Sequence, residues 1–193
     1  MQSFLDLAKA RKSVRKYKTD PIDGEALKRI LEAGRTAPSG NNSQPWRFVI
    51  VDDAKMKEAL FTVASKQRWI LEAPITIAVI ADITAKLKSE FKDEPVSTSD
   101  PRYNEVLIKS VRDATIAADH IVMAATDEGL GTCWIALYEQ EDIRPVLGVP
   151  DSCYVVSIIT IGYADQDPKA RPRRPLAEIA FKNRYGKEPF TGC

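Results

Sequence analysis

The sequence reads Arg11-Lys12-Ser13-Val14-Arg15 and then, after one predicted helix, Ala37-Pro38-Ser39-Gly40-Asn41-Asn42-Ser43-Gln44-Pro45-Trp46. The first stretch holds three cations and a serine hydroxyl within five residues. We expect it to end a helix, where these cations would lie within about one and a half turns. Like charges this close repel unless an anion or several carboxylates compensate, and arginine is the preferred planar partner of phosphate. The alternative interpretation is a solvated basic patch.

The second stretch predicts a polar loop that can meet a flat, hydrogen-bonding ring. Prolines fix both ends of the loop, and Gly40 permits a close approach. Its Ser, Asn and Gln side chains offer donors and acceptors that match the edge of a uracil-like ring. Flavin mononucleotide (FMN) carries both a phosphate and such a ring, so it fits the two stretches together. The alternative interpretation is a surface loop in which Asn and Ser form turns, with Trp46 in the core of the strand that follows.

Composition limits the other classes of function. The chain has 193 residues, of which 44% are hydrophobic and 28% charged, and its net charge is +1. These values predict one globular domain and disfavour a nucleic-acid module or a protein that binds a membrane surface. The longest apolar run, at 75–81, is too short to span a bilayer. The first residues lack the basic and apolar regions of a secretory signal, so we expect a cytoplasmic protein.

Few side chains in the sequence are suited to catalysis on their own. Cys133, Cys153 and Cys193 are odd in number and contain no CxxC, which indicates reduced thiols and no metal site. The single histidine, His120, is expected to be a hydrogen-bonded structural residue, and Cys133 an inert buried thiol. No acid/base pair stands out at helical spacing. If the chain is an enzyme, a cofactor is therefore expected to carry the reaction.

Hydrophobic periodicity predicts both helices and strands. Helices capped by Ser3, Asp23 and Asp53 are expected, the first ending near Lys12. Further helices are predicted at 86–92, 103–127 and 142–147. Strands are predicted at 46–51, 74–81, 132–136 and 154–162. This mixture points to an α+β or α/β sandwich, although a first strand after two helices is atypical of a doubly wound nucleotide fold.

Three segments have distinctive patterns. The long helix carries a seam of mostly small residues, suited to close helix packing: Leu107, Val111, Ala114, Ala118, Ile121 and Ala125. Residues 93–102 are expected to be a mobile excursion. The tail from 163 to 193 is basic and rich in proline, so we expect it to lie on something else, such as a second subunit. The Gly129-Leu130-Gly131 stretch follows a helix and precedes a strand, which is the wrong order for a dinucleotide-binding turn.

Taken together, these segments resemble the nitroreductase-like flavoprotein family, from Phe4 to about Arg184. The segments that carry the resemblance are 11–15, 37–46, 129–135 and 171–176. The resemblance implies an α+β fold, an α/β/α sandwich with a mostly antiparallel central sheet and a long central helix. It also implies a single FMN-binding domain over 1–193, with a lid at about 84–103. The seam would form the dimer contact of an intertwined homodimer, and the tail at about 163–193 would extend over the partner subunit.

The resemblance also implies the residues of the site. Arg11, Lys12, Ser13 and Arg15 would hold the phosphate and the pyrimidine edge from one subunit. Arg173, with Arg171 or Arg174, would add a second cation at the phosphate. Pro38, Ser39, Gly40 and Asn42 would contact the isoalloxazine from the other subunit. Backbone N–H groups around Ile135, Ala136 and Leu137 would face the flavin, and Gln67 matches a polar flavin contact loosely. Some members have Glu-Gly where this chain has Ala136-Leu137, so a carboxylate is absent there.

The function implied is that of an FMN-dependent NAD(P)H oxidoreductase with no catalytic side chain of its own. A nicotinamide would reduce the flavin, and a nitroaromatic, a quinone or a similar acceptor would then take the electrons at the same face in a ping-pong reaction. Two alternatives keep the flavin: reductive dehalogenation or flavin fragmentation, and a non-catalytic flavin-binding or redox-sensing protein. The choice between NADH and NADPH stays open, with Lys88, Lys92 and Arg102 as candidate contacts.

Overall fold

Four strands form the central sheet of the computed structural model, which describes residues 3–92, 97 and 99–190. They are β1 (Trp46–Val51), β2 (Ile75–Asp82), β3 (Gly131–Ile135) and β4 (Cys153–Gly162). Their order is β1-β2-β4-β3, and each neighbouring pair is antiparallel. The predicted strands are confirmed to within one residue at each end. The long β-branched runs of β2 and β4 favour strands that are buried on both faces.

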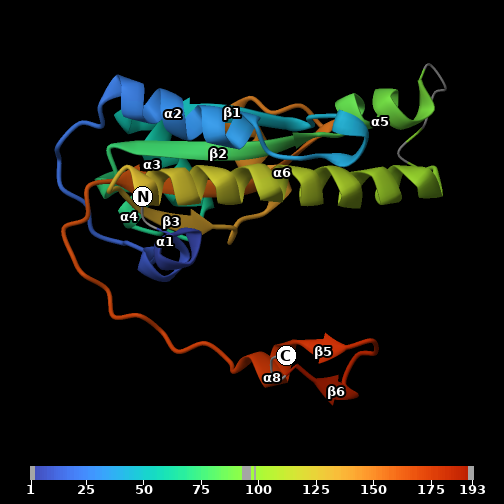
Figure 1. Ribbon diagram of the computed structural model, residues 1–193. Helices are drawn as coiled ribbons and strands as arrows, with labels where there is room; N and C mark the ends of the chain where they lie inside the picture. The colour runs from blue at the N-terminus through green and yellow to red at the C-terminus, as the bar shows by residue number, and fades with distance from the viewer. Residues whose placement is uncertain (1–2, 93–96, 98, 191–193) are drawn as a thin grey trace.

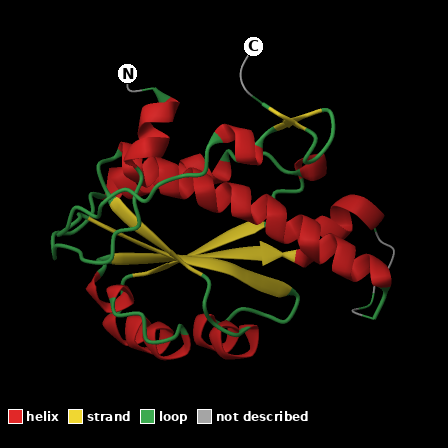
Figure 2. Ribbon diagram, turned by 90° about the horizontal axis from the view of Figure 1, so that it is seen from below, coloured by secondary structure: helices red, strands yellow, loops and turns green. Residues whose placement is uncertain are grey.

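Helices cover both faces of this sheet (Figure 2). Helices α2 (Gly24–Arg35) and α6 (Pro101–Asp127) lie over one face, and α3 (Ala54–Val63), α4 (Trp69–Glu72) and α7 (Gln140–Leu147) over the other. Side chains alternate between the two cores, with Ile159 in the first and Ile158 in the second. The α+β sandwich predicted from the sequence is confirmed. Among the described residues, no helix is long and apolar enough to cross a membrane.

Side-chain caps set most helix starts. Ser3, Asp23 and Asp53 accept backbone N–H bonds at the starts of α1 (Phe4–Ala10), α2 and α3, as predicted. Asp82 likewise caps α5 (Ile83–Phe91), which begins earlier than predicted. Helix α6 also begins early, at Pro101, because Asp100 accepts from Arg102 N. Half of the predicted mobile excursion, 93–96 and 98, lies outside the described residues.

The seam on α6 has a different partner from the one expected. Ala114, Ala118, Ile121 and Ala125 are fully buried in the core formed with the sheet and with α2. The expectation that this seam is the dimer contact is therefore wrong, because its own chain already occupies that face. Ile108 lies on the opposite, exposed side of the helix.

The basic stretch 11–15 does not lie on a helix, which corrects the sequence-based expectation. Helix α1 ends at Ala10, and the chain then runs parallel to β3, with a bridge between Ser13 and Thr132. Val14 N donates to Thr132 O at 2.8 Å, and the Val14 side chain is buried. A further helical turn would also satisfy this N–H, but pairing with the edge strand buries the Val14 side chain as well.

The C-terminal arm, residues 163–190, first pairs with residues 16–18 and then extends away from the sandwich (orange to red in Figure 1). It holds the short helix α8 (Leu176–Ile179) and a small hairpin of β5 (Phe181–Lys182) and β6 (Glu188–Pro189). Its large apolar side chains are exposed: Leu176, Ile179, Tyr185 and Phe190. The arm therefore leaves apolar surface uncovered in a single chain.

Candidate functional site

A cavity of about 550 Å³ lies between the segment that follows α1 and the start of the C-terminal arm. Seven basic residues line it: Lys9, Arg11, Lys12, Arg15, Lys169, Arg171 and Arg173. Ser13 adds a hydroxyl, and the lining contains no Asp or Glu among the residues that the structure describes. We refer to this cavity as the basic pocket. Its lining can bind an anion such as a phosphate, since arginine and hydroxyl donors match phosphate oxygens.

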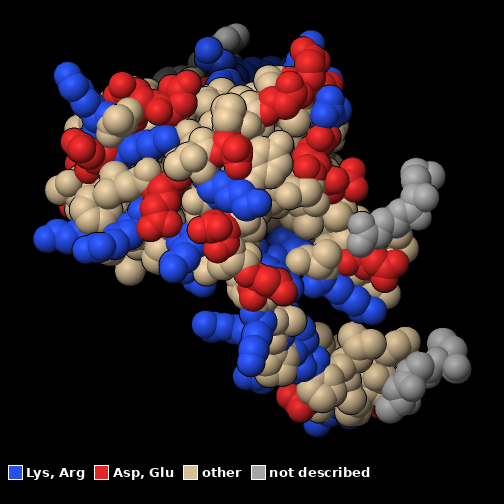
Figure 3. All heavy atoms as spheres, turned by 90° about the vertical axis from the view of Figure 1, so that its left-hand side faces the viewer, with Lys and Arg blue, Asp and Glu red and all other residues tan. Residues whose placement is uncertain are grey.

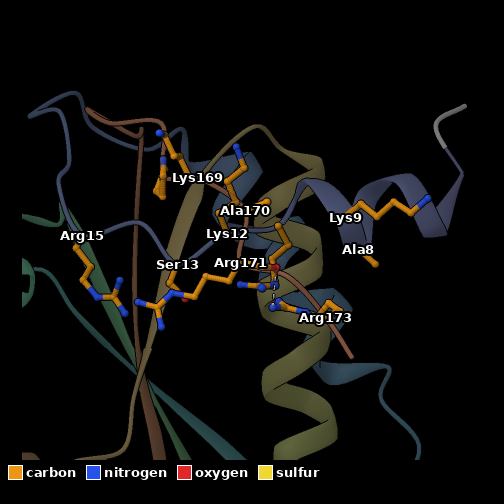
Figure 4. Close-up of a pocket in the computed structure, with 11 residues that line it drawn as sticks. Ala8, Lys9, Lys12, Ser13, Arg15, Lys169, Ala170, Arg171 and Arg173 are labelled. Atoms are coloured by element: carbon orange, nitrogen blue, oxygen red, sulfur yellow. Dashed lines mark hydrogen bonds between the residues drawn. The ribbon is translucent and has the colours of Figure 1, made fainter. Parts of the chain in front are cut away.

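The two segments face one another across the basic pocket (Figure 4). Lys12 Nζ bonds Asp167 Oδ1 at 2.7 Å, which ties the start of the arm to the body and neutralises one of the cations. Arg173 Nη1 donates to Arg171 O at 3.3 Å and shapes the arm locally. Lys and Arg side chains gather around the hollow between the arm and the body (Figure 3). The remaining cations lack carboxylate partners among the described residues, which favours a bound anion.

Packing against the sheet fixes the segment that carries Arg11 and Arg15. The buried Tyr17 hydroxyl donates to Val14 O at 2.8 Å and lies 2.8 Å from Thr160 Oγ1 on β4. Burial raises the pKa of Tyr17, so its hydroxyl stays protonated. Gly131 permits the close approach, because a Cβ there would lie 2.7 Å from Val14 Cγ2. The position of the basic pocket therefore depends on the buried Tyr17 hydroxyl and on Gly131.

Arg15 also contacts an aromatic side chain that does not line the basic pocket. Its guanidinium lies 5.2 Å from the centre of the Trp69 ring, at cation–π distance. Trp69 Nε1 is buried without a hydrogen-bond partner among the described residues. Burial raises the pKa of Cys133, and Arg15 only partly opposes this rise, so the thiol stays protonated as expected for an inert buried residue.

The predicted ring contacts lie beyond the other end of β3. Ile135 is buried, whereas Ala136 is exposed and Leu137 is 66% exposed. Ser65 Oγ donates to Leu137 O at 3.1 Å, which joins this turn to the loop that holds Gln67. Strand β3 therefore runs from Thr132, the bridge partner of Ser13, towards the turn at 136–137.

The polar loop 38–42 lies elsewhere in the chain. It contains the short 3-10 helix η1 (Gly40–Asn42), and Gly40 and Asn41 line a different cavity of about 820 Å³ together with residues of α5 and α6. The two cavities share no lining residue. In Figure 1, α1 and α5 lie towards opposite ends of α6. The structure thus brings Arg11, Lys12, Ser13, Arg15, Arg171 and Arg173 together, and it does not bring Pro38, Ser39, Gly40 or Asn42 to them. Arg174 is exposed outside the pocket lining.

Sequence reasoning missed several residues around these sites. Lys9 and Lys169 line the basic pocket, and Trp69 contacts Arg15. Lys86 and Asp113 are buried beside the polar loop. For Asp113 a signal existed, because it shares the helical face of Val106, Ser110 and Ala117, at the 3 and 4 spacing of buried positions. For the lysines and Trp69 no local pattern pointed to the contact.

Comparisons with known proteins point to one family and one fold. A model of the nitroreductase family matches residues 8–163. A Bacillus subtilis protein that is named as an NAD(P)H nitroreductase is 31% identical over 203 residues, covering 92% of this chain and 96% of the relative. The crystal structure of nitroreductase A from Vibrio parahaemolyticus is similar with a TM-score of 0.86 at 26% identity, covering 97% of this chain and 78% of that one. A protein of Exiguobacterium sibiricum, solved in complex with FMN, has a TM-score of 0.80 at 25% identity and covers 93% and 97%.

Proposed function

Because the chain belongs to the nitroreductase family, we propose that it is an FMN-dependent NAD(P)H oxidoreductase. The observation that carries this proposal is the basic pocket, where seven cations and a serine hydroxyl gather with no acidic residue in the described lining. Such a lining is suited to a phosphate monoester, which FMN provides. The relative solved with FMN supports the same cofactor for this chain.

The residues present fit the cofactor. Arg11, Arg171 and Arg173 are planar donors that can each meet two phosphate oxygens, and Ser13 can donate a further bond. Arg15, held over Trp69, brings a positive charge towards the β3 edge. Ala136 and Leu137 present an exposed turn next to that edge, where their backbone N–H groups and the apolar Leu137 side chain can meet a ring. We also propose Gln67 as a polar contact from the adjoining loop.

FMN, when bound, supplies the transfer of hydride and electrons between a nicotinamide and a second acceptor. The chain's own contribution is to bind, to orient and to exclude water. The nearby Cys133 is not suited to act as a nucleophile, since it is buried and its pKa is raised. We propose that the acceptor is a nitroaromatic, a quinone or a similar molecule.

We further propose that the working unit is a homodimer in which each cofactor site takes residues from both subunits. The polar loop 38–42 lies apart from the basic pocket of its own chain, so a second copy would have to bring it there. The apolar side chains of the arm are exposed, as are Phe4, Leu5 and Ile108. A partner subunit would cover this apolar surface, since exposed apolar patches often mark sites of protein–protein contact.

The proposal is tested with the purified protein and added FMN. The protein should become yellow, and NADH or NADPH should bleach it under anaerobic conditions. An acceptor should then restore the colour. A protein that is colourless once the excess FMN has been removed by desalting would overturn the proposal. Tight FMN binding with very slow reduction by both nicotinamides would instead favour a non-catalytic flavin-binding protein.

A further inference from the structure

A buried ion pair, Lys86 and Asp113, binds the backbone of the polar loop at Gly40. Lys86 on α5 is only 2% exposed, and Asp113 on α6 is 8% exposed. Lys86 Nζ lies 2.9 Å from Asp113 Oδ2, 2.9 Å from Gly40 O and 3.2 Å from Ser43 Oγ. These three acceptors match the three N–H donors of an ammonium group. Gly40 N also donates to Asp113 Oδ2 at 3.2 Å, so the pair holds both the N–H and the C=O of one residue. We call Lys86, Asp113 and Gly40 the Gly40 clasp.

The loop needs such external support because its own backbone is unusual. Asn41, Asn42 and Gln44 all have positive φ, at 55°, 52° and 46°, a region that asparagine tolerates but glutamine disfavours. Within the loop, Ser39 Oγ accepts from Gln44 N at 3.0 Å, and the Gln44 amide reaches Asn42. Gly40, Asn41 and Asn42 are exposed, so core packing does not fix them. The clasp is therefore the main contact between the loop tip and the body.

Gly40 leaves room for this contact. A Cβ at this position would lie 2.8 Å from Lys86 Nζ, closer than real Cβ atoms come to a neighbour. The absence of a side chain at Gly40 is what allows the ammonium group to reach the loop backbone. The loop and the lysine are thus matched to one another.

The clasp belongs to a charge network between α5 and α6. Glu90 on α5 lies 3.8 Å from Lys86 Nζ and 3.0 Å from Lys109 Nζ on α6. Lys109 pairs in turn with Glu105 at 2.8 Å. Burying charges is unfavourable unless each one is paired and hydrogen-bonded, which this network achieves. Asp113 is the close partner of Lys86, whereas Lys109 is linked to Lys86 only through Glu90.

We propose that Lys86 and Asp113 are positioning residues that hold loop 38–44 in the shape in which it contacts the flavin ring. This inference rests on the proposed function, because it takes the loop to be a flavin contact. Neither side chain need touch the cofactor. Each acts through the backbone of Gly40, so removal of either one is expected to loosen the loop and to change the surroundings of the bound ring.

The test compares Lys86→Met and Asp113→Asn with Lys109→Met. The control changes a lysine of the same network that has no hydrogen bond to the loop in the described contacts. Amide hydrogen exchange of residues 38–44 is measured without flavin, and FMN affinity and the visible spectrum of bound flavin are measured in the same preparations. Asp113→Asn keeps an acceptor for Gly40 N, so it provides a milder variant if Lys86→Met folds poorly.

We expect both clasp variants to speed exchange at 38–44 and to weaken FMN binding by about tenfold, as for the loss of one or two hydrogen bonds. They should also shift the flavin spectrum at saturating FMN, which a general loss of stability would not do. The Lys109→Met protein should match the wild type in all three measurements.

Each contrary result has a distinct meaning. Unchanged exchange at 38–44 in both clasp variants would overturn the inference, whether or not FMN binds. Faster exchange with an unchanged flavin spectrum and affinity would also overturn it, since the loop would then not be a flavin contact. A wild-type protein that binds no FMN would overturn the proposed function and with it the positioning of a ring. The exchange data would then show only whether the clasp holds the loop.

Discussion

Arg173 and Arg174 are adjacent arginines in the arm, but the structure places only Arg173 in the lining of the basic pocket. Arg173→Ala should therefore raise the dissociation constant of FMN by about tenfold or more, because it removes a charge-assisted contact to phosphate. Arg174→Ala removes the same charge one residue away and should leave the affinity nearly unchanged. Flavin fluorescence titration at low and high salt measures both. Equal losses in the two variants would show that only the overall charge of the arm matters.

Gly131 controls how closely the basic segment approaches the sheet. A Cβ there would meet Val14 at 2.7 Å, and Val14 is buried and hydrogen-bonded in place. Gly131→Ala should lower the free energy of unfolding by about 1–3 kcal/mol, as is usual for overpacking, and should also weaken FMN binding.

Gly24→Ala is the matched control, because nothing lies within 4 Å of a Cβ at that position. It should leave stability unchanged or raise it by less than about 1 kcal/mol, and leave FMN binding unaffected. Urea unfolding compares the two variants. A Gly131→Ala protein as stable as the Gly24→Ala protein would mean that the segment can shift freely.

At this scale the sequence predicts residue types better than contacts. Arg11, Ser13 and Arg173 could be proposed because their chemistry suits phosphate and the resemblance gave their order. Lys86 could not be matched to Gly40, since 46 residues separate them and only the packing of α5 brings them together. Arg174 could not be separated from Arg173, because the path of the arm decides which side chain enters the pocket.

At the scale of elements, Lys57 connects α3 to the start of β2. Its buried ammonium donates to Ala73 O and Pro74 O, both at 2.7 Å. Burial lowers the pKa of Lys57 below the ordinary 10.5, and Asp52 and Asp53 oppose this effect only in part. The unfolded chain therefore binds this proton more tightly than the folded one. Between the folded pKa and 10.5 the unfolded state holds more protons, so the Lys57 contribution to the free energy of unfolding rises with pH.

The stability of the wild type relative to Lys57→Met should accordingly increase from about pH 7 to about pH 10. Taking the difference between the two proteins cancels the titration of all other groups. Lys55→Met, which changes an exposed lysine of the same helix, should show no such trend. Urea unfolding at several pH values measures the difference in the free energy of unfolding between the wild type and each variant. A constant difference for Lys57→Met would show that burial does not perturb this amine.

The elements themselves were largely predictable, because caps and periodicity are local. Asp23 and Asp53 begin their helices as expected, and β1 has the predicted bounds. The two errors have a common physical origin. Residues 11–15 pair with β3, and Ala118 packs on the chain's own sheet, and both contacts join segments that are distant in sequence. A local pattern shows that a face is apolar or basic, but it does not show what that face meets.

For the whole molecule, the basic pocket and the polar loop lie apart in one chain, and we have proposed that they belong to one cofactor site. If each cofactor site combines the pocket of one subunit with the loop of the other, two defective subunits can complement one another. Arg11→Ala damages the pocket and Asn42→Ala damages the loop. Each variant alone should form dimers in which both sites carry one damaged part.

Mixing the two variants, unfolding them together and refolding them should produce mixed dimers as about half of the population. In a mixed dimer one site takes both damaged parts, and the other takes an intact Arg11 and an intact Asn42. The mixture should therefore recover about one quarter of the wild-type sites, measured as flavin bound or as reduction rate, because half of the dimers have one good site in two. Refolding each variant separately provides the control. If both parts serve the same chain, every site in every dimer stays damaged and the mixture gains nothing. Recovery of about one quarter of the sites would mean that a second copy of the chain completes each cofactor site. The separation of the two cavities within one chain would then follow from this sharing.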